Sequence, residues 1–233
     1  MTRIPLEGTY NTRDLGGYAT AHQCTQFGRF LRSDSIAELS AHDMETLTQM
    51  GIKTIVDLRM PNEIEKAPNP LSHHSAFNYY HVPLMDNPTS STFDVKNIPE
   101  DFLSTLYIQL IEASKTHIKT LFEIFDQHPE GLLFHCTAGK DRTGVTAMLL
   151  LGLAGVSDAD IIADYQVSYT YIKQDPKVQT YMKHVPPHIF YTQPEYLEKT
   201  LEHIHTHYGT IPEYLESIGI EPDVLKRVRA SML

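Results

Sequence analysis

Residues 135–144 read His135-Cys136-Thr137-Ala138-Gly139-Lys140-Asp141-Arg142-Thr143-Gly144. A short apolar run, residues 132–134, precedes them, and an almost wholly apolar segment, Val145 to Ala154, follows. The first run is typical of a fully buried strand and the second of a buried helix. The residues between them are therefore predicted to form a tight loop at the carboxyl end of a strand, where α/β sheets bind ligands. The backbone N–H groups of such a loop, together with the helix N-terminus, form a site for an anion such as phosphate.

Apolar periodicity on both sides of this loop predicts alternating strands and helices. Strands are expected at residues 27–32, 52–58 and 77–84, which are rich in β-branched and aromatic residues. Helices are expected after the capping boxes at Ser40 and Ser157, across about Pro99 to Phe125, and at residues 194–207, 212–218 and 222–232. The segment from Asn11 to Tyr18 is expected to be a turn or loop.

This alternation predicts an α/β fold with a mainly parallel central sheet flanked by helices and with extra C-terminal helices. A length of 233 residues suits one domain. We expect residues 1–233 to form a single domain, with residues 187–233 as a helical extension packed on it.

Charge and cysteine content restrict the partners and the compartment. The formal net charge of −10 argues against nucleic acid and membrane surfaces as partners, because both are polyanions. Two distant cysteines, Cys24 and Cys136, favour a reducing compartment over a disulfide framework. The first residues contain no signal-peptide core, and no apolar run approaches the roughly 18 residues of a membrane span. We expect a cytoplasmic protein without an integral membrane segment; export without a signal peptide and the oligomeric state stay open.

Each residue type in the loop has a chemical use. Cys136 is the predicted nucleophile, since helix N-termini and nearby cations favour the thiolate form of cysteine. Arg142 offers a planar fork that matches two phosphate oxygens, which a lysine lacks. Thr143 is expected to donate its hydroxyl to the sulfur when Cys136 leaves, and His135 to hold the loop by hydrogen bonding. The residues predicted to surround the bound phosphate are His135, Thr137, Ala138, Gly139, Lys140 and Arg142; Gly139 allows the backbone to turn tightly.

These residues resemble the signature loop of the protein tyrosine phosphatase superfamily, and most closely that of its bacterial atypical group, His-Cys-x-x-Gly-Lys-Asp-Arg-Thr-Gly. The similarity extends over most of the chain, through residues 11–17, 31–34, 51–59 and 163–165. The resemblance implies hydrolysis of phosphotyrosine through a phosphocysteine intermediate, with action on phosphoserine, phosphothreonine or phosphoinositides in several members. The implied partners are a phosphorylated protein or a phosphoinositide.

A leaving phenolate needs a proton, so a general acid is expected near the ester oxygen. Asp86 is the first candidate by chain position, although the chain has no tryptophan and so lacks the Trp-Pro-Asp of many relatives. Asp141 is the second candidate, since it lies inside the loop. Asp57 is the third, at the end of a predicted strand, with a salt bridge to Arg59 as its alternative role.

Several other charged residues have alternative interpretations. In relatives, a lysine at the position of Lys140 accompanies tolerance of phosphoinositide headgroups; the alternative is a solvated lysine. For Arg13, Asp14, Arg32 and Asp34 we favour a buried ion-pair network that braces the loop. The histidines, including His203, His205 and His207, show no metal-ligand spacing, and the predicted chemistry needs neither a metal nor another cofactor.

Three rival functions remain at this stage. A phosphoinositide phosphatase would use the same loop. A phosphate-binding module without turnover would not need the nucleophile Cys136. A sulfur-transfer domain also has a loop cysteine, but the continuation Lys140-Asp141-Arg142-Thr143-Gly144 argues against it.

Overall fold

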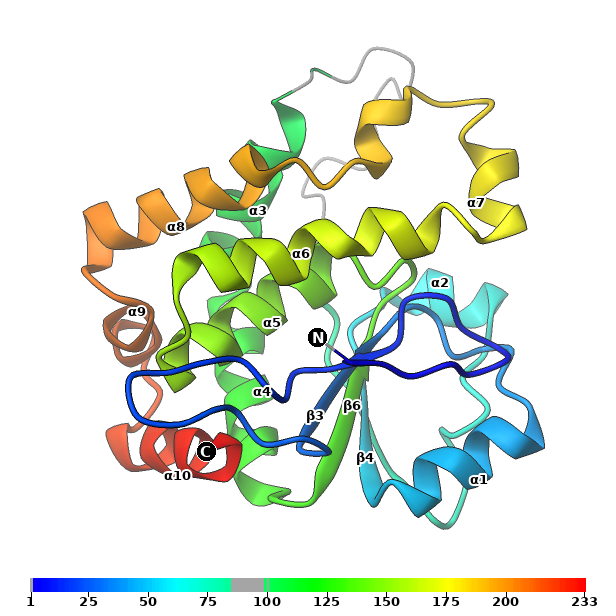
Figure 1. Ribbon diagram of the computed structural model, residues 1–233, viewed down its shortest axis with the longest axis horizontal. Helices are drawn as coiled ribbons and strands as arrows, with labels where there is room; N and C mark the ends of the chain where they lie inside the picture. Colours follow the sequence, from blue (N-terminus) through cyan, green and yellow to red (C-terminus); the bar gives the residue numbers. More distant parts are fainter. Residues whose placement is uncertain (1, 85–98, 100) are drawn as a thin grey trace.

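The computed structural model describes residues 2–84, 99 and 101–233, and its centre is a mixed sheet (Figure 1). The described strands lie in the order β1-β2-β3-β6-β4-β5. β3, β6, β4 and β5 are parallel, whereas β1 and β2 are antiparallel at one edge. The bounds are β1 Thr2–Arg3, β2 Arg13–Asp14, β3 Phe30–Ser33, β4 Ile52–Asp57, β5 Asn78–His81 and β6 Gly131–His135. The predicted α/β class with a mainly parallel sheet is confirmed.

Side chains of the central strands alternate between two apolar clusters, one on each face of the sheet. In β6, Leu132 and Phe134 belong to the larger cluster, and Leu133 belongs to the smaller one. The larger cluster includes residues of α3 Phe102–Ala113, α4 Lys115–Gln127, α5 Asp141–Ala154 and α6 Asp158–Ile172. The smaller one packs against α1 Ala41–Gln49, and α2 Pro61–Lys66 follows β4 at the end of the sheet (Figure 1). Burial on both faces explains why the strands are nearly continuous apolar runs.

Local signals account for most helix boundaries. Ser40 caps α1 in a reciprocal capping box with Asp43, and the Ser157 side chain accepts from the Asp160 N–H at the start of α6. α5 ends at Gly155, which adopts a left-handed conformation with φ of +88°. The helix expected across about Pro99 to Phe125 is instead two helices, because Ser114 leaves helical geometry between α3 and α4.

Two other boundaries differ from the prediction. The strand expected over 27–32 corresponds to β3, which begins at Phe30 rather than Phe27, and the strand expected over 77–84 is shortened to β5. The segment 11–18, expected to be a loop, contains β2, because Arg13 and Asp14 pair with β3. A strand of only two residues is too short to produce an alternating apolar pattern in the sequence.

The chain from Pro176 on is helical. It comprises α7 Pro176–Tyr181 and the 3₁₀ turn η2 Pro187–Phe190, which were not predicted, and α8 Pro194–Tyr208, α9 Ile211–Ser217 and α10 Pro222–Met232, which confirm the three helices expected there. α8 contacts α3 and α6, and α10 contacts α4 and α5 (Figure 1). The Tyr214 hydroxyl donates to the Ile111 carbonyl at 2.8 Å, which ties α9 to α3. Among the described residues, no helix has the length and hydropathy of a membrane span.

Candidate active site

The loop that follows β6 lies where three parallel strands end together. Ser33 of β3 and Asp57 of β4 are both in register with His135, the last residue of β6. Cys136 follows immediately, and α5 begins at Asp141. The predicted strand, loop and helix are therefore present, and the loop lies at the carboxyl ends of the central strands.

Residues from outside the loop bind its carbonyl oxygens. The Ser35 N–H donates to the Thr137 carbonyl at 2.9 Å. The Asn11 side-chain amide donates to the Ala138 and Gly139 carbonyls at 3.1 and 3.0 Å. In a planar trans peptide the N–H points opposite to the C=O. The peptide N–H groups that follow these carbonyls therefore point toward the centre of the loop, the arrangement that binds an anion.

Gly139 is required at its position for two reasons. Its φ of +66° lies in the left-handed region, and a Cβ there would stand 2.6 Å from the Asp34 backbone nitrogen and 2.7 Å from the Ser33 carbonyl carbon. Both neighbours are backbone atoms that cannot turn aside. The loop can pack against the end of β3 only because this residue has no side chain.

A buried ion-pair network braces the loop from behind. The Asp164 carboxylate accepts from Arg13 Nε at 2.9 Å, from Arg32 Nη1 and from the Tyr18 hydroxyl at 2.9 Å. Arg32 Nη2 also donates to the Gly139 carbonyl at 2.8 Å. Burial opposes ionisation of Asp164, but the charges of Arg13 and Arg32 outweigh it and hold the pKa of Asp164 well below its usual range. The carboxylate is thus the centre of a permanently charged support.

The expected roles of Arg13 and Arg32 in such a network are confirmed, and those of two aspartates differ. Asp34 is buried and accepts from the N–H groups of Tyr10 and Asn11 at 2.9 and 3.0 Å, which places Asn11 beside the loop. Asp14 instead accepts from the N–H groups of Gly16 and Gly28, both at 2.7 Å. Asp14 therefore organises the turn between β2 and β3 and not the loop.

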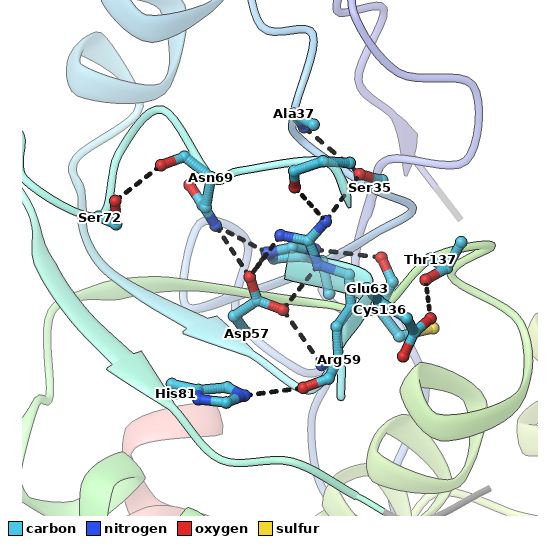
Figure 2. Close-up of polar contacts among 12 residues, drawn as sticks. Ser35, Ala37, Asp57, Arg59, Glu63, Asn69, Ser72, His81, Cys136 and Thr137 are labelled. Atoms are coloured by element: carbon cyan, nitrogen blue, oxygen red, sulfur yellow. Dashed lines mark hydrogen bonds and ion pairs between the residues drawn. The ribbon is translucent and has the colours of Figure 1, made fainter. Parts of the chain in front are cut away.

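Asp57 is the centre of a second buried cluster (Figure 2). Its carboxylate accepts from Arg59 Nε at 2.9 Å and Nη2 at 2.7 Å, and from the Tyr79 hydroxyl at 3.1 Å. His135 Nε2 lies 3.4 Å from it. Burial opposes ionisation, but hydrogen bonds from His135 and Arg59 outweigh it and lower the pKa of Asp57 well below its usual range. The Asp57 side chain is fully buried and bound on both oxygens, so it cannot reach a substrate; it has the salt bridge to Arg59 that was its alternative role.

His135 is fully buried in the same cluster, with Nε2 3.0 Å from the Asn69 side-chain amide and Nδ1 3.1 Å from the Cys136 carbonyl oxygen. These contacts match the expected role of holding the loop. They place the imidazole behind the loop and away from the surface that a phosphate would contact.

Arg142 is held by a residue that the sequence analysis did not consider, Glu63 of α2. Arg142 Nη1 and Nη2 donate to the two Glu63 carboxylate oxygens at 2.6 and 2.9 Å. The Thr137 hydroxyl donates to the same carboxylate (Figure 2). Burial opposes ionisation of Glu63, but the hydrogen bonds and the charge of Arg142 outweigh it and lower the pKa to about 2. The Met60 N–H also donates to Glu63 at 2.8 Å, so the same side chain caps α2.

Asp141 lies at the first position of α5 and accepts from the hydroxyl of the buried Tyr107, which is also 2.7 Å from the Tyr165 hydroxyl. Burial and the charge of Asp141 raise the pKa of Tyr107 well above its usual value, so the phenol stays protonated. The Asp141 side chain is 24% exposed, unlike that of Asp57, and it therefore remains accessible to solvent.

Cys136 and Thr143 are both buried at the base of the loop. The Thr143 hydroxyl has no hydrogen-bond partner within the part of the chain that the structure describes. Buried hydroxyls are rarely left in this state. The second cysteine, Cys24, is exposed, and its backbone pairs with Ala19 in an isolated antiparallel β-bridge.

A model of the tyrosine phosphatase family matches residues 4–233 of this chain. The chain belongs to the tyrosine phosphatase family. A tyrosine-protein phosphatase of Nostoc commune is 30% identical over 217 residues, which cover 87% of this chain and 74% of that protein. The triple specificity protein phosphatase PtpB of Mycobacterium tuberculosis is 25% identical, with 98% of each chain covered. These comparisons confirm the family that the signature loop indicated.

In this tyrosine phosphatase family member, Lys140 lies in an unexpected place. Its side chain is 2% exposed, and its ammonium donates to the carbonyl oxygens of Ile189 and Tyr191, the latter at 3.5 Å, and lies 3.2 Å from Asp141. The lysine therefore points into the segment around η2. Neither the predicted contact with a headgroup nor the alternative of a solvated lysine describes this position.

Two further outcomes concern residues outside this arrangement. Asp86, the first candidate for the general acid, lies outside the described residues. Among the residues that are described, no group of histidine, cysteine and carboxylate side chains has the geometry of a metal site.

Glu63 is the main residue that sequence reasoning missed. One feature of the sequence could have pointed to Glu63. It lies four residues after Arg59, in a short helix that follows the charged end of a strand.

Proposed function

We propose that this protein hydrolyses phosphotyrosine monoesters through a phosphocysteine intermediate on Cys136. The observation that carries the proposal is the loop itself, in which Cys136 precedes α5, the carbonyl oxygens are bound from outside and Arg142 lies in the first turn. A thiolate, inward N–H groups and a guanidinium around one centre are the parts that a phosphoryl transfer needs.

The first chemical step forms a bond between the Cys136 sulfur and phosphorus while the bond from phosphorus to the phenolic oxygen breaks. The phenolate takes a proton from a carboxylic acid, and Asp141 is the candidate among the described residues. In the second step, water attacks phosphorus and the bond to sulfur breaks, which releases inorganic phosphate. Thr143 donates its hydroxyl to the departing thiolate, a role that suits a buried hydroxyl without another partner.

Arg142 binds the phosphoryl oxygens in both steps. A guanidinium has five N–H donors in a planar fork, and Glu63 accepts from one on each terminal nitrogen. Glu63 therefore holds the plane of the guanidinium beside the loop. Gly139 and the inward N–H groups of residues 138–140 complete the cradle.

The test is steady-state hydrolysis of an aryl phosphate by the wild type, Cys136→Ser and Cys24→Ser. Cys24 is exposed, so its substitution is a matched control for the loss of one thiol. We expect activity in the wild type and Cys24→Ser, no activity in Cys136→Ser, and a phosphorylated Cys136 peptide in acid-quenched wild type. Equal hydrolysis by Cys136→Ser would exclude Cys136 as the nucleophile. A folded, reduced wild type that binds phosphate without turnover would favour the phosphate-binding module.

Phosphoproteins are the substrates that we propose, rather than phosphoinositides. The lysine that would have contacted a headgroup, Lys140, is buried and bound to backbone carbonyls. We also propose that residues 1–233 act as one phosphatase domain in the cytoplasm. The single domain is supported by the packing of α8 on α3 and α6 and of α10 on α4 and α5. Removal of residues 187–233 would expose the apolar side chains of these helices. Truncation at residue 186 is expected to yield insoluble or inactive protein.

A further inference from the structure

A groove with a volume of about 420 Å³ opens directly beside the catalytic loop. Thr137 and Ala138 of the loop line it, together with Tyr10 and Ala67. Residues of α7 and η2 form a further wall, and α7 lies on the same side of the molecule as α2 (Figure 1). The groove is at the lower end of the range of roughly 300–1,000 Å³ that is usual for ligand sites.

The wall formed by α7 and η2 is apolar and partly exposed. Val178, Tyr181 and Phe190 line it, and the rings of Tyr181 and Phe190 meet edge to face with centroids 5.9 Å apart. Tyr181 is 53% exposed, although it is a large aromatic residue. Exposed aromatic side chains around a hollow are typical of binding surfaces.

Lys140 connects this wall to the catalytic loop. Its ammonium donates to the carbonyl oxygens of Ile189 and Tyr191, the two neighbours of Phe190 in the chain. The residue that follows Gly139 in the loop thus holds the segment that carries Phe190. The groove and the catalytic loop therefore form one continuous surface.

The charge on the rim is negative. Asp34, Glu38 and Asp175 line the groove, but Asp34 is buried and bound by backbone N–H groups, and Glu38 is paired with Lys177, the one lining cation among the described residues. Asp175 is therefore the lining carboxylate that gives the rim its negative charge. A polyanionic inositol headgroup would be repelled by this carboxylate, whereas a basic peptide side chain would be attracted.

We infer that this groove receives the residues next to phosphotyrosine in a peptide substrate, with Tyr181 and Phe190 as specificity-determining residues. The inference rests on the proposed function, because the phosphate must sit in the loop for the flanking chain to reach the groove. The groove selects an apolar residue beside the phosphotyrosine and a basic residue further along.

The test compares kcat/KM for a small aryl phosphate with kcat/KM for matched phosphotyrosine peptides. One peptide has leucine beside the phosphotyrosine and a lysine further along; two others replace the leucine with alanine or the lysine with glutamate. In the wild type we expect the leucine–lysine peptide to exceed the alanine peptide about tenfold, the lower end for an apolar group in a pocket. We expect a loss of about threefold when lysine becomes glutamate.

Tyr181→Ala is expected to bring the leucine-to-alanine ratio below twofold. Phe27→Ala, which removes another exposed aromatic residue that does not line the groove, should leave the ratio unchanged. Asp175→Asn, which retains a side chain that can cap α7, should halve the preference for lysine.

The outcomes separate the two proposals. If the wild type does not hydrolyse the aryl phosphate, the proposed function fails. If it does, but Tyr181→Ala leaves the peptide ratio at the wild-type value, the groove inference is overturned. Phosphatidylcholine vesicles that contain a phosphatidylinositol monophosphate are the third substrate. A higher kcat/KM for these vesicles than for every peptide, lowered by Tyr181→Ala, would overturn the inference in favour of a lipid site.

Discussion

Glu63 of α2 and Arg142 of α5 form a bidentate ion pair with N–O distances of 2.6 and 2.9 Å, although they are far apart in the sequence. The same carboxylate accepts a hydrogen bond from the hydroxyl of Thr137, the residue that follows the nucleophile Cys136. Bidentate pairs of arginine with carboxylate combine charge with a defined orientation. Glu63 therefore acts as a positioning residue that sets the plane of the Arg142 guanidinium.

Glu63→Gln is expected to lower kcat/KM for an aryl phosphate roughly tenfold, because a charge-assisted hydrogen bond contributes about 1.5–3 kcal/mol. The matched control is Glu65→Gln, an exposed residue of the same helix, which should retain wild-type activity. Steady-state kinetics on both variants is the measurement. A rise in kcat/KM for Glu63→Gln would show that the carboxylate competes with the phosphate for Arg142.

The same pair predicts a pH dependence of stability. The pKa of Glu63 is lowered from its ordinary value of 4.5 to about 2 in the folded protein. Since the folded pKa is depressed, the contribution is complete above about pH 4.5 and is lost as the pH falls toward 2. Urea unfolding between pH 5 and pH 2.5 should therefore show a smaller loss of stability in Glu63→Gln than in the wild type. Parallel curves for the two proteins would contradict the assignment.

Asp141 is the proposed acid, so Asp141→Asn should reduce kcat roughly a hundredfold on alkyl phosphates, where the leaving group needs the proton. The loss should be much smaller on an aryl phosphate with an acidic phenol. Tyr107→Phe, which removes the hydrogen bond to the carboxylate but keeps the carboxyl group, should show an intermediate loss. Unchanged turnover of both substrates by Asp141→Asn would move the role to Asp86, and Asp86→Asn would then be measured in the same way.

Lys140→Met should loosen the segment around η2, because the variant keeps the aliphatic stem and loses the donor to the Ile189 and Tyr191 carbonyls. Hydrogen exchange at the amides of residues 187–191 is expected to accelerate roughly tenfold or more, in line with the loss of a charged hydrogen bond. Lys183→Met, at an exposed position after α7, is the control. The ratio of phosphoinositide to phosphotyrosine activity should stay unchanged in Lys140→Met. A fall in that ratio would restore the headgroup role.

Asp164→Asn is expected to destabilise the fold by about 3–5 kcal/mol, because it leaves two buried arginines, Arg13 and Arg32, without their counter-charge. Thermal unfolding should show the loss directly. Asp160→Asn, in the first turn of the same helix, should change stability little, since asparagine can replace its hydrogen bond with Ser157. Similar melting temperatures for Asp164→Asn and the wild type would mean that the network is not a structural support.

Local features of this chain were predictable because they depend on near neighbours. The strand over 131–135, the tight loop and the helix over 141–154 follow from two apolar runs and a glycine-containing polar segment. The helices after Ser40, Ser157 and Pro222 follow from caps and from apolar periodicity. By contrast, the two-residue pairing of β2 and the break at Ser114 depend on packing against distant segments.

The sequence by itself determined the α/β class, the signature loop and the identity of the expected nucleophile, since strand, loop and helix are encoded within one continuous segment. Only the tertiary structure decided which charges meet: Glu63 with Arg142, Asp57 with Arg59 and His135, and Lys140 with the carbonyls around η2. The physical reason is that a charged side chain can be satisfied by any opposite charge or carbonyl within reach. Reach is set by the order of β3, β6 and β4 and by the packing of distant helices, which no local pattern specifies.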